Sequence, residues 1–237
     1  MQIIRIIIMV IMAACAKGGC SDLMAYPLSP TAAPIAVEEP ANQFQDFVLM
    51  DIVFPEERYA NFMDGLSLGD PNAPVYVTQF SDYQCPGCGY YWAELEPTMI
   101  SEYINNGRVY LSYSPFSFIG EFSEYSDWDE SKKAAEAAFC ANDQGSFWFY
   151  NDLLYANQNG ENQGGFDRDH LMSMAYYSGL DMQSFATCLD NGEHSLEVEN
   201  ANDFAEQMGV TYTPSFLVNG ALVGAGDLFD AIDQELK

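Results

Sequence analysis

The chain has 237 residues, of which 49% are hydrophobic, so it is long and apolar enough to bury a core, and wholesale disorder is excluded. Eight lysines and arginines stand against 35 aspartates and glutamates, and the net charge of −27 excludes nucleic acid as a partner, because phosphate-backbone binding needs clustered basic residues. So large a charge repels itself unless it is screened, so we expect the protein to work in saline surroundings or beside basic clients.

The amino terminus resembles an export signal. Arg5 precedes an apolar run over residues 6–14, which is shorter than the roughly 20 residues of a membrane-spanning helix and fits the apolar region of a signal peptide. We therefore predict a signal peptide over residues 1–14. Met-Ala-Ala-Cys at residues 12–15 resembles the lipobox of bacterial lipoproteins, which implies that Cys15 carries a lipid.

Either a lipid on Cys15 or a plain cleaved signal would place the mature chain outside the cytoplasm, in the periplasm or on the outer face of the cell membrane, where disulfides persist. In the first case the chain touches the membrane through its lipid anchor only. Cys20 is the weaker lipidation candidate. Residues 15–42 repeat proline among alanine, serine and threonine and are predicted to be an extended tether. Residues 43–63 fit either a packed helix or more linker.

A strand, a helix and a second strand follow in order. Residues 75–80 are rich in β-branched and aromatic side chains, as in a buried strand. A helical pattern then runs to about residue 105, and residues 109–113 form the next strand. Such a unit predicts a parallel pair of strands with a right-handed crossover. Cys85 and Cys88 fall where the first strand passes into the helix.

The rest of the chain is a helical block followed by a hairpin and a last helix. Glycines separate five predicted helices, at residues 131–141, 147–157, 168–178, 182–190 and 196–208. The aromatic run at 147–150 is interpreted as core with one exposed member. Asn219-Gly220 predicts a two-residue hairpin turn between strands 215–218 and 222–223, and Asp227 is the expected cap of a helix over 227–236.

This order predicts an α/β domain interrupted by an all-helical insertion. We place the first part of the α/β domain at residues 64–120, the insertion at 121–195 and the second part at 196–237.

The cysteine pair carries the clearest chemistry. Cys85 would stand at a helix amino terminus, where the positive end of the helix dipole favours thiolate, and thiolate is the attacking species in disulfide exchange. Cys85 is therefore the predicted nucleophile and Cys88 the resolving thiol. Pro86 suits the first helical position. The nearest basic residues in sequence are Arg58 and Arg108, so activation is expected to come mainly from the helix terminus.

Two other interpretations of the pair stay open. A zinc site would need further ligands from Cys140, Cys188, His170 or His194, but structural zinc sites usually show a second closely spaced pair, which this sequence lacks. No metal is therefore expected, and both histidines are expected to be solvated surface residues. A purely structural disulfide is the other alternative. A redox-active pair is favoured over both.

Residues 69–88 (GDPNAPVYVTQFSDYQCPGC) and 209–220 (GVTYTPSFLVNG) resemble the DsbA-like branch of the thioredoxin superfamily. The resemblance implies a thioredoxin-like fold with a helical insertion, spanning roughly residues 64–237. It also implies a cis-proline at Pro214 which, with Thr213, pairs with the backbone of a substrate. Pro86 and Gly87 are expected to complete the substrate-facing surface.

The resemblance further implies an extracytoplasmic thiol–disulfide oxidoreductase whose redox-active disulfide serves in place of a cofactor. Its partners would be reduced exported proteins or peptides and a quinone-linked membrane protein that reoxidises it. Oxidation of client dithiols is the preferred direction. The alternatives are a reductase or isomerase of the same fold, or a non-enzymatic, lipid-tethered module that binds peptides or metal.

The sequence departs from many members of that branch at two positions. Gly87 stands where a histidine is common, and Gln79 where a glutamate is common. Loss of the histidine is expected to make the disulfide less oxidising, and glutamine cannot take up a proton from the resolving thiol.

Cys140 and Cys188 lie on two of the predicted helices. In an exported protein, buried cysteines on neighbouring helices are best explained as a structural disulfide. Two inert core thiols or a second redox pair are the alternatives.

Overall fold

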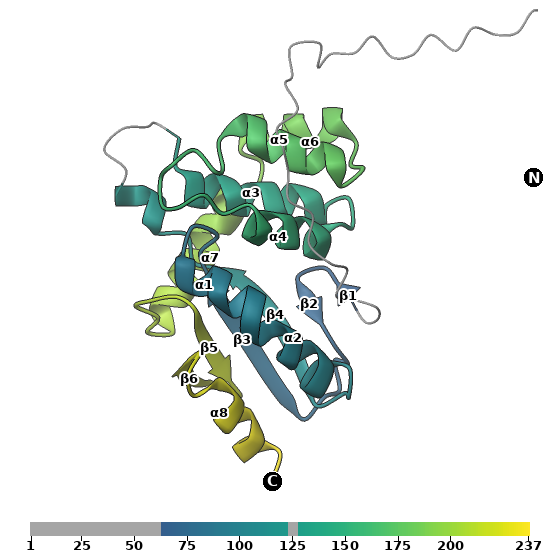
Figure 1. Ribbon diagram of the computed structural model, residues 1–237, viewed down its shortest axis with the longest axis vertical. Coiled ribbons are helices and arrows are strands. Elements are labelled where there is room, and N and C mark those ends of the chain that lie inside the picture. The colour runs from purple at the N-terminus through teal and green to yellow at the C-terminus, as the bar shows by residue number, and fades with distance from the viewer. Residues whose placement is uncertain (1–62, 123–127) are drawn as a thin grey trace, which may run out of the picture. The chain divides into compact units, whose positions relative to one another are not determined.

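A six-stranded mixed sheet in the order β1-β2-β4-β3-β5-β6 organises the protein (Figure 1). The computed structural model describes residues 63–122 and 128–237. The strands are β1 (Met63–Asp64), β2 (Ser67–Leu68), β3 (Val75–Ser81), β4 (Val109–Pro115), β5 (Ser215–Val218) and β6 (Ala221–Gly224). The predictions for the signal peptide, Cys15, Cys20, the linker and residues 43–62 fall outside the described residues.

The two central strands are the predicted parallel pair. β3 and β4 run side by side from Val75 opposite Val109 to Ser81 opposite Pro115. β5 joins β3 in the antiparallel direction and continues into the hairpin with β6. Asn219 and Gly220 both have positive φ, 46° and 89°, as a tight hairpin turn of matching twist requires. The α/β architecture expected from the sequence is therefore confirmed.

The helix after Cys85 differs from the uniform helix expected over residues 85–105. It consists of α1 (Pro86–Tyr90), a π-helical segment η1 (Tyr91–Leu95), α2 (Glu96–Thr98) and a second π-helical segment η2 (Met99–Ile104). The N–H of Glu96 bonds to the carbonyl of Tyr91, five residues back. Pro97 explains the irregularity, because it has no N–H and its ring crowds the preceding turn.

The expected helical block is present. Its helices are α3 (Glu130–Asn142), α4 (Phe147–Ala156), α5 (Arg168–Tyr177), α6 (Met182–Asn191) and α7 (Ser195–Gln207). Asp129, Asp167 and Asp181 cap α3, α5 and α6 through their side chains. Asp227 stands at the cap position of α8 (Leu228–Glu235), but its side chain makes no capping bond, contrary to expectation. The backbone N–H of Asp227 donates to the carbonyl of Gly224.

The helices cover both faces of the sheet and one of its ends. Figure 1 shows α1 and α2 crossing one face, α7 behind the sheet and α3 to α6 stacked beyond one end. On the first face the ring of Tyr103 stacks on Phe229 of α8, with centroids 5.4 Å apart. On the α7 side a smaller apolar cluster forms from Phe80, Phe116, Ala205, Val210 and Leu217. Within residues 63–122 and 128–237 no helix has the length and apolar character needed to cross a bilayer.

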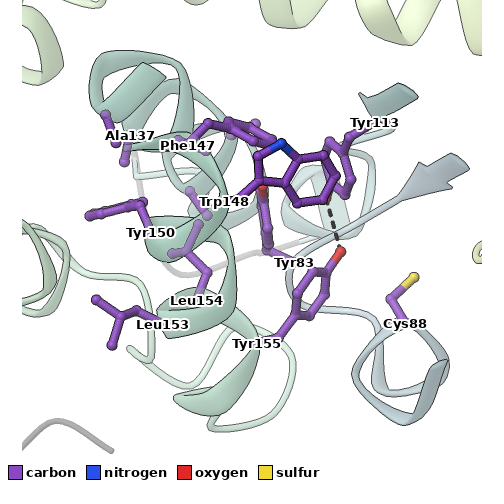
Figure 2. Close-up of a cluster of buried hydrophobic side chains, with 14 of the residues drawn as sticks. Tyr83, Cys88, Tyr113, Ala137, Phe147, Trp148, Tyr150, Leu153, Leu154 and Tyr155 are labelled. Atoms are coloured by element: carbon purple, nitrogen blue, oxygen red, sulfur yellow. Dashed lines mark hydrogen bonds between the residues drawn. The ribbon is translucent and has the colours of Figure 1, made fainter. Parts of the chain in front are cut away.

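Aromatic side chains fill the junction between the sheet and the helical block (Figure 2). Phe147, Trp148 and Tyr150 of α4 are buried, whereas Phe149 is 38% exposed. The interpretation of this run as core with one exposed member is confirmed. The buried ring of Tyr83, just after β3, lies 5.0 Å from that of Tyr155 at the end of α4. This packing fixes the helical block against the segment that leads into Cys85.

Candidate active site

Cys85 and Cys88 lie on the turn that leads from β3 into α1. Cys85 is the residue that caps α1, and Pro86 occupies its first position. The N–H of Cys85 donates to the carbonyl of Asp82 (3.1 Å), and the N–H of Cys88 donates to the carbonyl of Cys85 (3.0 Å). Cys85 is 8% exposed and Cys88 is completely buried. One sulfur is therefore within reach of a partner, and the other is shielded behind it.

The pKa values of the two thiols are shifted in opposite directions. The pKa of Cys85 falls from 9.0 to about 6, chiefly because the Cys88 thiol donates a hydrogen bond to its sulfur, with lesser help from Thr213 and the N–H groups of Cys88 and Gly87. Burial opposes this shift. Burial is also the main cause that raises the pKa of Cys88 well above its usual value. The helix terminus was expected to be the main activator of Cys85; its first-turn N–H groups do contribute, and the Cys88 thiol makes the largest single contribution.

A cis peptide bond joins Thr213 and Pro214 beside the reactive turn. The thiol of Cys85 donates to the carbonyl of Thr213 over 3.4 Å. A Cβ added to Gly87 would lie 3.3 Å from Cδ of Pro214 and 3.6 Å from Sγ of Cys85. The structure thus brings together the residues expected to face a substrate, although Thr213 and Pro214 lie far from Cys85 along the chain.

Asp82 is a site residue that the sequence analysis missed. Its buried carboxylate accepts hydrogen bonds on one oxygen from the N–H of Gln84 and the hydroxyl of Ser131, both 2.8 Å. The other oxygen accepts the N–H groups of Phe118 (2.9 Å) and Ile119 (3.0 Å). Burial raises the pKa of Asp82, and these donors oppose the rise. No local sequence pattern predicts this hydrogen-bonded carboxylate, because three of its four donors come from other elements.

Gln158, after α4, also contacts the reactive turn and was missed. Its Nε2 donates to the carbonyls of Tyr83 (2.6 Å) and Cys85 (3.1 Å). A Cβ on Gly89 would overlap the Gln158 amide, so this glycine leaves the space that the amide occupies. The glycine directly after the second cysteine was the one sequence feature that could have indicated a close contact at this point.

Gln79, the second departure from the related sequences, is buried in β3. Its Nε2 donates to Oγ of Ser81 over 3.1 Å. Position 79 therefore holds a neutral amide, where many related sequences have a carboxyl group that can titrate.

Cys140 of α3 and Cys188 of α6 form a disulfide, with Cα atoms 5.9 Å apart and a sequence separation of 48. His194 lies beside them, and its ring nitrogens contact Asp143 (2.8 Å) and Glu197. Its side chain is only 16% exposed, so the expectation of a solvated residue is wrong, because two carboxylates and the ring of Phe139 cover it.

The zinc alternative finds no support at the reactive turn. In the part of the chain that the structure describes, the one group of three metal-ligand side chains at mutual ligand distance is Cys140, Cys188 and His194. Its two sulfurs are already bonded to each other. Within the same residues, Cys85 and Cys88 belong to no such group.

Comparison with known proteins assigns this arrangement to a family. A family model described as thioredoxin matches residues 63–236. A probable disulfide bond formation protein D of Bacillus cereus is 34% identical over 177 residues, which covers 72% of this chain and 78% of the relative. The chain belongs to the DsbA-like branch of the thioredoxin superfamily.

Solved structures agree with this DsbA-like assignment. The oxidised crystal structure of BdbD from Bacillus subtilis has a TM-score of 0.65 and 25% identity, and it covers 73% of this chain and 92% of that one. Wolbachia pipientis alpha-DsbA1, at 20% identity and a TM-score of 0.59, shares the fold over 71% of this chain and 89% of its own. The thioredoxin-like fold with a helical insertion is thus confirmed, and this DsbA-like protein is a thiol–disulfide oxidoreductase.

Proposed function

We propose that this protein oxidises dithiols of exported proteins or peptides through Cys85 and Cys88, outside the cytoplasm. The observation that carries the proposal is the geometry of the reactive turn, where a partly accessible Cys85 lies beside the buried Cys88 and the Thr213–Pro214 loop, and where the Cys88 thiol lowers the pKa of Cys85 to about 6. Stabilising the thiolate favours the reduced form of the pair, and a pair that prefers to be reduced is a strong oxidant of others. The relatives named for disulfide bond formation support the same direction.

The reaction consists of two exchanges of sulfur partners. A client thiolate attacks Sγ of Cys85 in the Cys85–Cys88 disulfide, the bond between the two sulfurs breaks, and Cys88 leaves and takes up a proton. The second client thiolate then attacks the client sulfur of the mixed disulfide and releases Cys85 as a thiolate. Two electrons pass from client to enzyme. The low pKa of Cys85 favours the second step, because a more acidic thiol leaves faster.

Thr213 and Pro214 would hold the client during this exchange. Their loop lies against both Gly87 and the thiol of Cys85, so a client backbone paired with it would present a sulfur to Cys85. Pro86 and Gly87 would extend the same surface, and the absence of a side chain at Gly87 leaves the space beside Pro214 and the Cys85 sulfur free.

The reduced pair must then be reoxidised. We assign this step to a quinone-linked membrane protein whose own disulfide accepts the two electrons, as the family implies. A signal peptide over residues 1–14, a lipid on Cys15 and the tether over 15–42 would keep the enzyme close to such a partner. Cys140–Cys188 serves as a structural cross-link and takes no part in the electron transfer.

The direction of exchange is tested by the equilibrium of the Cys85–Cys88 couple with a glutathione series, with Cys85→Ser as the control. A potential near about −120 mV, that of a strong oxidase, supports the proposal. A potential near about −270 mV, that of thioredoxin, indicates a reductase and overturns it. The activity measurement is the oxidation of a reduced peptide with two cysteines, monitored as the loss of its free thiols.

A further inference from the structure

The loop between α4 and α5 holds the backbone of the reactive turn. Gln158, on this loop, binds two carbonyl groups at once, those of Tyr83 and Cys85. The Cys85 carbonyl also accepts the N–H groups of Cys88 (3.0 Å) and Gly89 (3.1 Å), which begin the helix. Gln158 therefore acts on the group that sets the direction of the first helical turn.

Asn162, four positions further along the same loop, holds the residue next to the nucleophile. Its backbone N–H donates to Oε1 of Gln84 over 2.6 Å, and its side-chain oxygen accepts from Nε2 of Gln84 over 3.3 Å. Asn162 has a φ of 55°, a left-handed conformation that few residues other than glycine and asparagine adopt readily. Such conformations persist where the surroundings hold them and concentrate at functional sites.

We propose that Gln158 and Asn162 are positioning residues of the active site, through which the helical insertion fixes the sulfur of Cys85 in its reactive place. This inference rests on the proposed function, because it gives the insertion a role in the same thiol–disulfide exchange. The two residues act through the backbone of Tyr83 and Cys85 and through the side chain of Gln84, and neither contacts the reacting sulfur.

The physical reason is the short range of the bonds that stabilise the Cys85 thiolate. The thiolate depends on hydrogen bonds from the side chains of Cys88 and Thr213 and from the N–H groups of Cys88 and Gly87. Hydrogen bonds weaken steeply with distance and angle. Without Gln158 the carbonyls of Tyr83 and Cys85 lose a donor, and the turn can shift its sulfur away from these partners.

The test compares Gln158→Leu with Gln144→Leu. Gln144 is a matched control, because it also bridges two backbone groups of the insertion: its side chain donates to the carbonyl of Asp181 (3.3 Å) and accepts the Asp181 N–H (2.7 Å). The readout is the pH midpoint for alkylation of the reduced protein by iodoacetamide. Mass spectrometry of the peptide that contains Cys85 and Cys88 separates this reaction from alkylation at Cys15 and Cys20. Within that peptide the midpoint at pH 4 to 8 reports Cys85, because Cys88 is buried and its pKa lies well above the usual value.

We expect Gln158→Leu to raise the midpoint by about one pH unit, because hydrogen bonds to a thiolate favour its charged form. Gln144→Leu should leave the midpoint at the wild-type value while lowering the melting temperature to a similar extent. Gly89→Ala is a second route to the same result: its added methyl group displaces the Gln158 amide, and alanine favours the helix that Gly89 belongs to. It too should raise the midpoint.

Wild-type midpoints in both Gln158→Leu and Gly89→Ala would overturn the proposal. So would an equal rise in Gln144→Leu, because the effect would then reflect stability in general. The proposed function fails separately, if the wild-type protein leaves a reduced peptide unoxidised; the midpoints remain measurable in that case, because alkylation needs no client.

Discussion

The two cysteine pairs of this structure have the same chemistry and opposite surroundings. Cys85 and Cys88 are free thiols at the start of a helix, and the sulfur that reaches the surface has a pKa lowered to about 6. Cys140 and Cys188 are buried between α3 and α6 and are bonded to each other. Cysteines three positions apart can form and break a disulfide with only local change in the chain. A disulfide between cysteines 48 positions apart instead closes a long loop and joins separate helices.

The comparison shows that reactivity depends on what surrounds the sulfur. At the reactive turn the surroundings supply hydrogen bonds to a thiolate and access for a partner. At the α3–α6 cross-link they supply packing on all sides, so the bond contributes to stability. Five changes would break or sharpen this contrast.

The largest effect is expected at the nucleophile. Cys85→Ser removes the sulfur that clients attack, so oxidation of a reduced peptide should fall to the uncatalysed background. Cys88→Ser should also fail to oxidise the peptide, because no Cys85–Cys88 disulfide can form, but unlike Cys85→Ser it should hold a mixed disulfide on Cys85 when it is given glutathione disulfide. Non-reducing electrophoresis and mass spectrometry distinguish the two outcomes. Full activity of Cys85→Ser would contradict the assignment.

Removal of the other pair should change stability and leave chemistry intact. We expect the Cys140→Ala, Cys188→Ala double variant to lose about 2–4 kcal/mol of unfolding free energy, since a cross-link of this kind restricts the unfolded chain. Its rate of peptide oxidation at 25 °C should stay within about twofold of the wild-type rate, because the reactive turn is unchanged. Denaturant unfolding measures the first effect. A large loss of rate in the folded variant would indicate a second redox pair.

The pH dependence should separate the pairs further. With a pKa of about 6, alkylation of Cys85 should rise roughly a hundredfold from pH 4 to pH 8, because only the thiolate reacts. The lowered pKa also stabilises the folded reduced protein. That contribution is complete above about pH 9, the usual thiol value, and is lost as the pH falls towards 6.

The oxidised protein is the control for this prediction, because its Cys85 does not titrate. The melting temperature of the reduced form, measured relative to the oxidised form, should therefore rise between pH 6 and pH 9. A flat difference over this range would contradict a lowered pKa.

Gly87→His should sharpen the contrast by a smaller amount. A Cβ at this position lies 3.3–3.6 Å from Pro214, Cys85 and Thr213, so a side chain fits after shifts of a few tenths of an ångström. An imidazolium beside the sulfur stabilises thiolate, and a further fall of about one pKa unit corresponds to about tenfold in the thiolate equilibrium. The equilibrium with glutathione should shift towards the reduced pair. Gly87→Ala is the control for steric effects alone.

The smallest effect concerns the net charge of −27. Raising the salt concentration from low values to about 1 M screens repulsion among exposed carboxylates, so the melting temperature should rise by a few degrees. The alkylation midpoint of Cys85 should move less, because its partners are short-range hydrogen bonds. A melting temperature that does not rise would remove the basis for a saline working environment.

The sequence by itself determined the features that depend on neighbouring residues. The strand–helix–strand unit, the five helices and the Asn219-Gly220 hairpin follow from hydrophobic periodicity and turn chemistry, which act over a few positions. The roles expected of Cys85 and Cys88 rest on the same local logic, a sulfur at the start of a helix and a second one turn later. Two local expectations failed: Pro97, whose missing N–H altered the hydrogen bonding of the predicted helix, and Asp227, whose side chain makes no capping bond.

Only the tertiary structure decided which distant residues hold the site. Gln158 reaches Tyr83 across 75 positions, Asp82 accepts from Ser131 across 49, and Cys85 meets Thr213 across 128. The surroundings of His194 were also misjudged, because its partner Asp143 lies 51 positions away. A short sequence pattern carries no record of such pairings, since they exist only after the insertion packs against the sheet. The sequence thus specified the reactive sulfur and its nearest activator, Cys88, and the packed fold added Thr213 and the contacts that hold the turn.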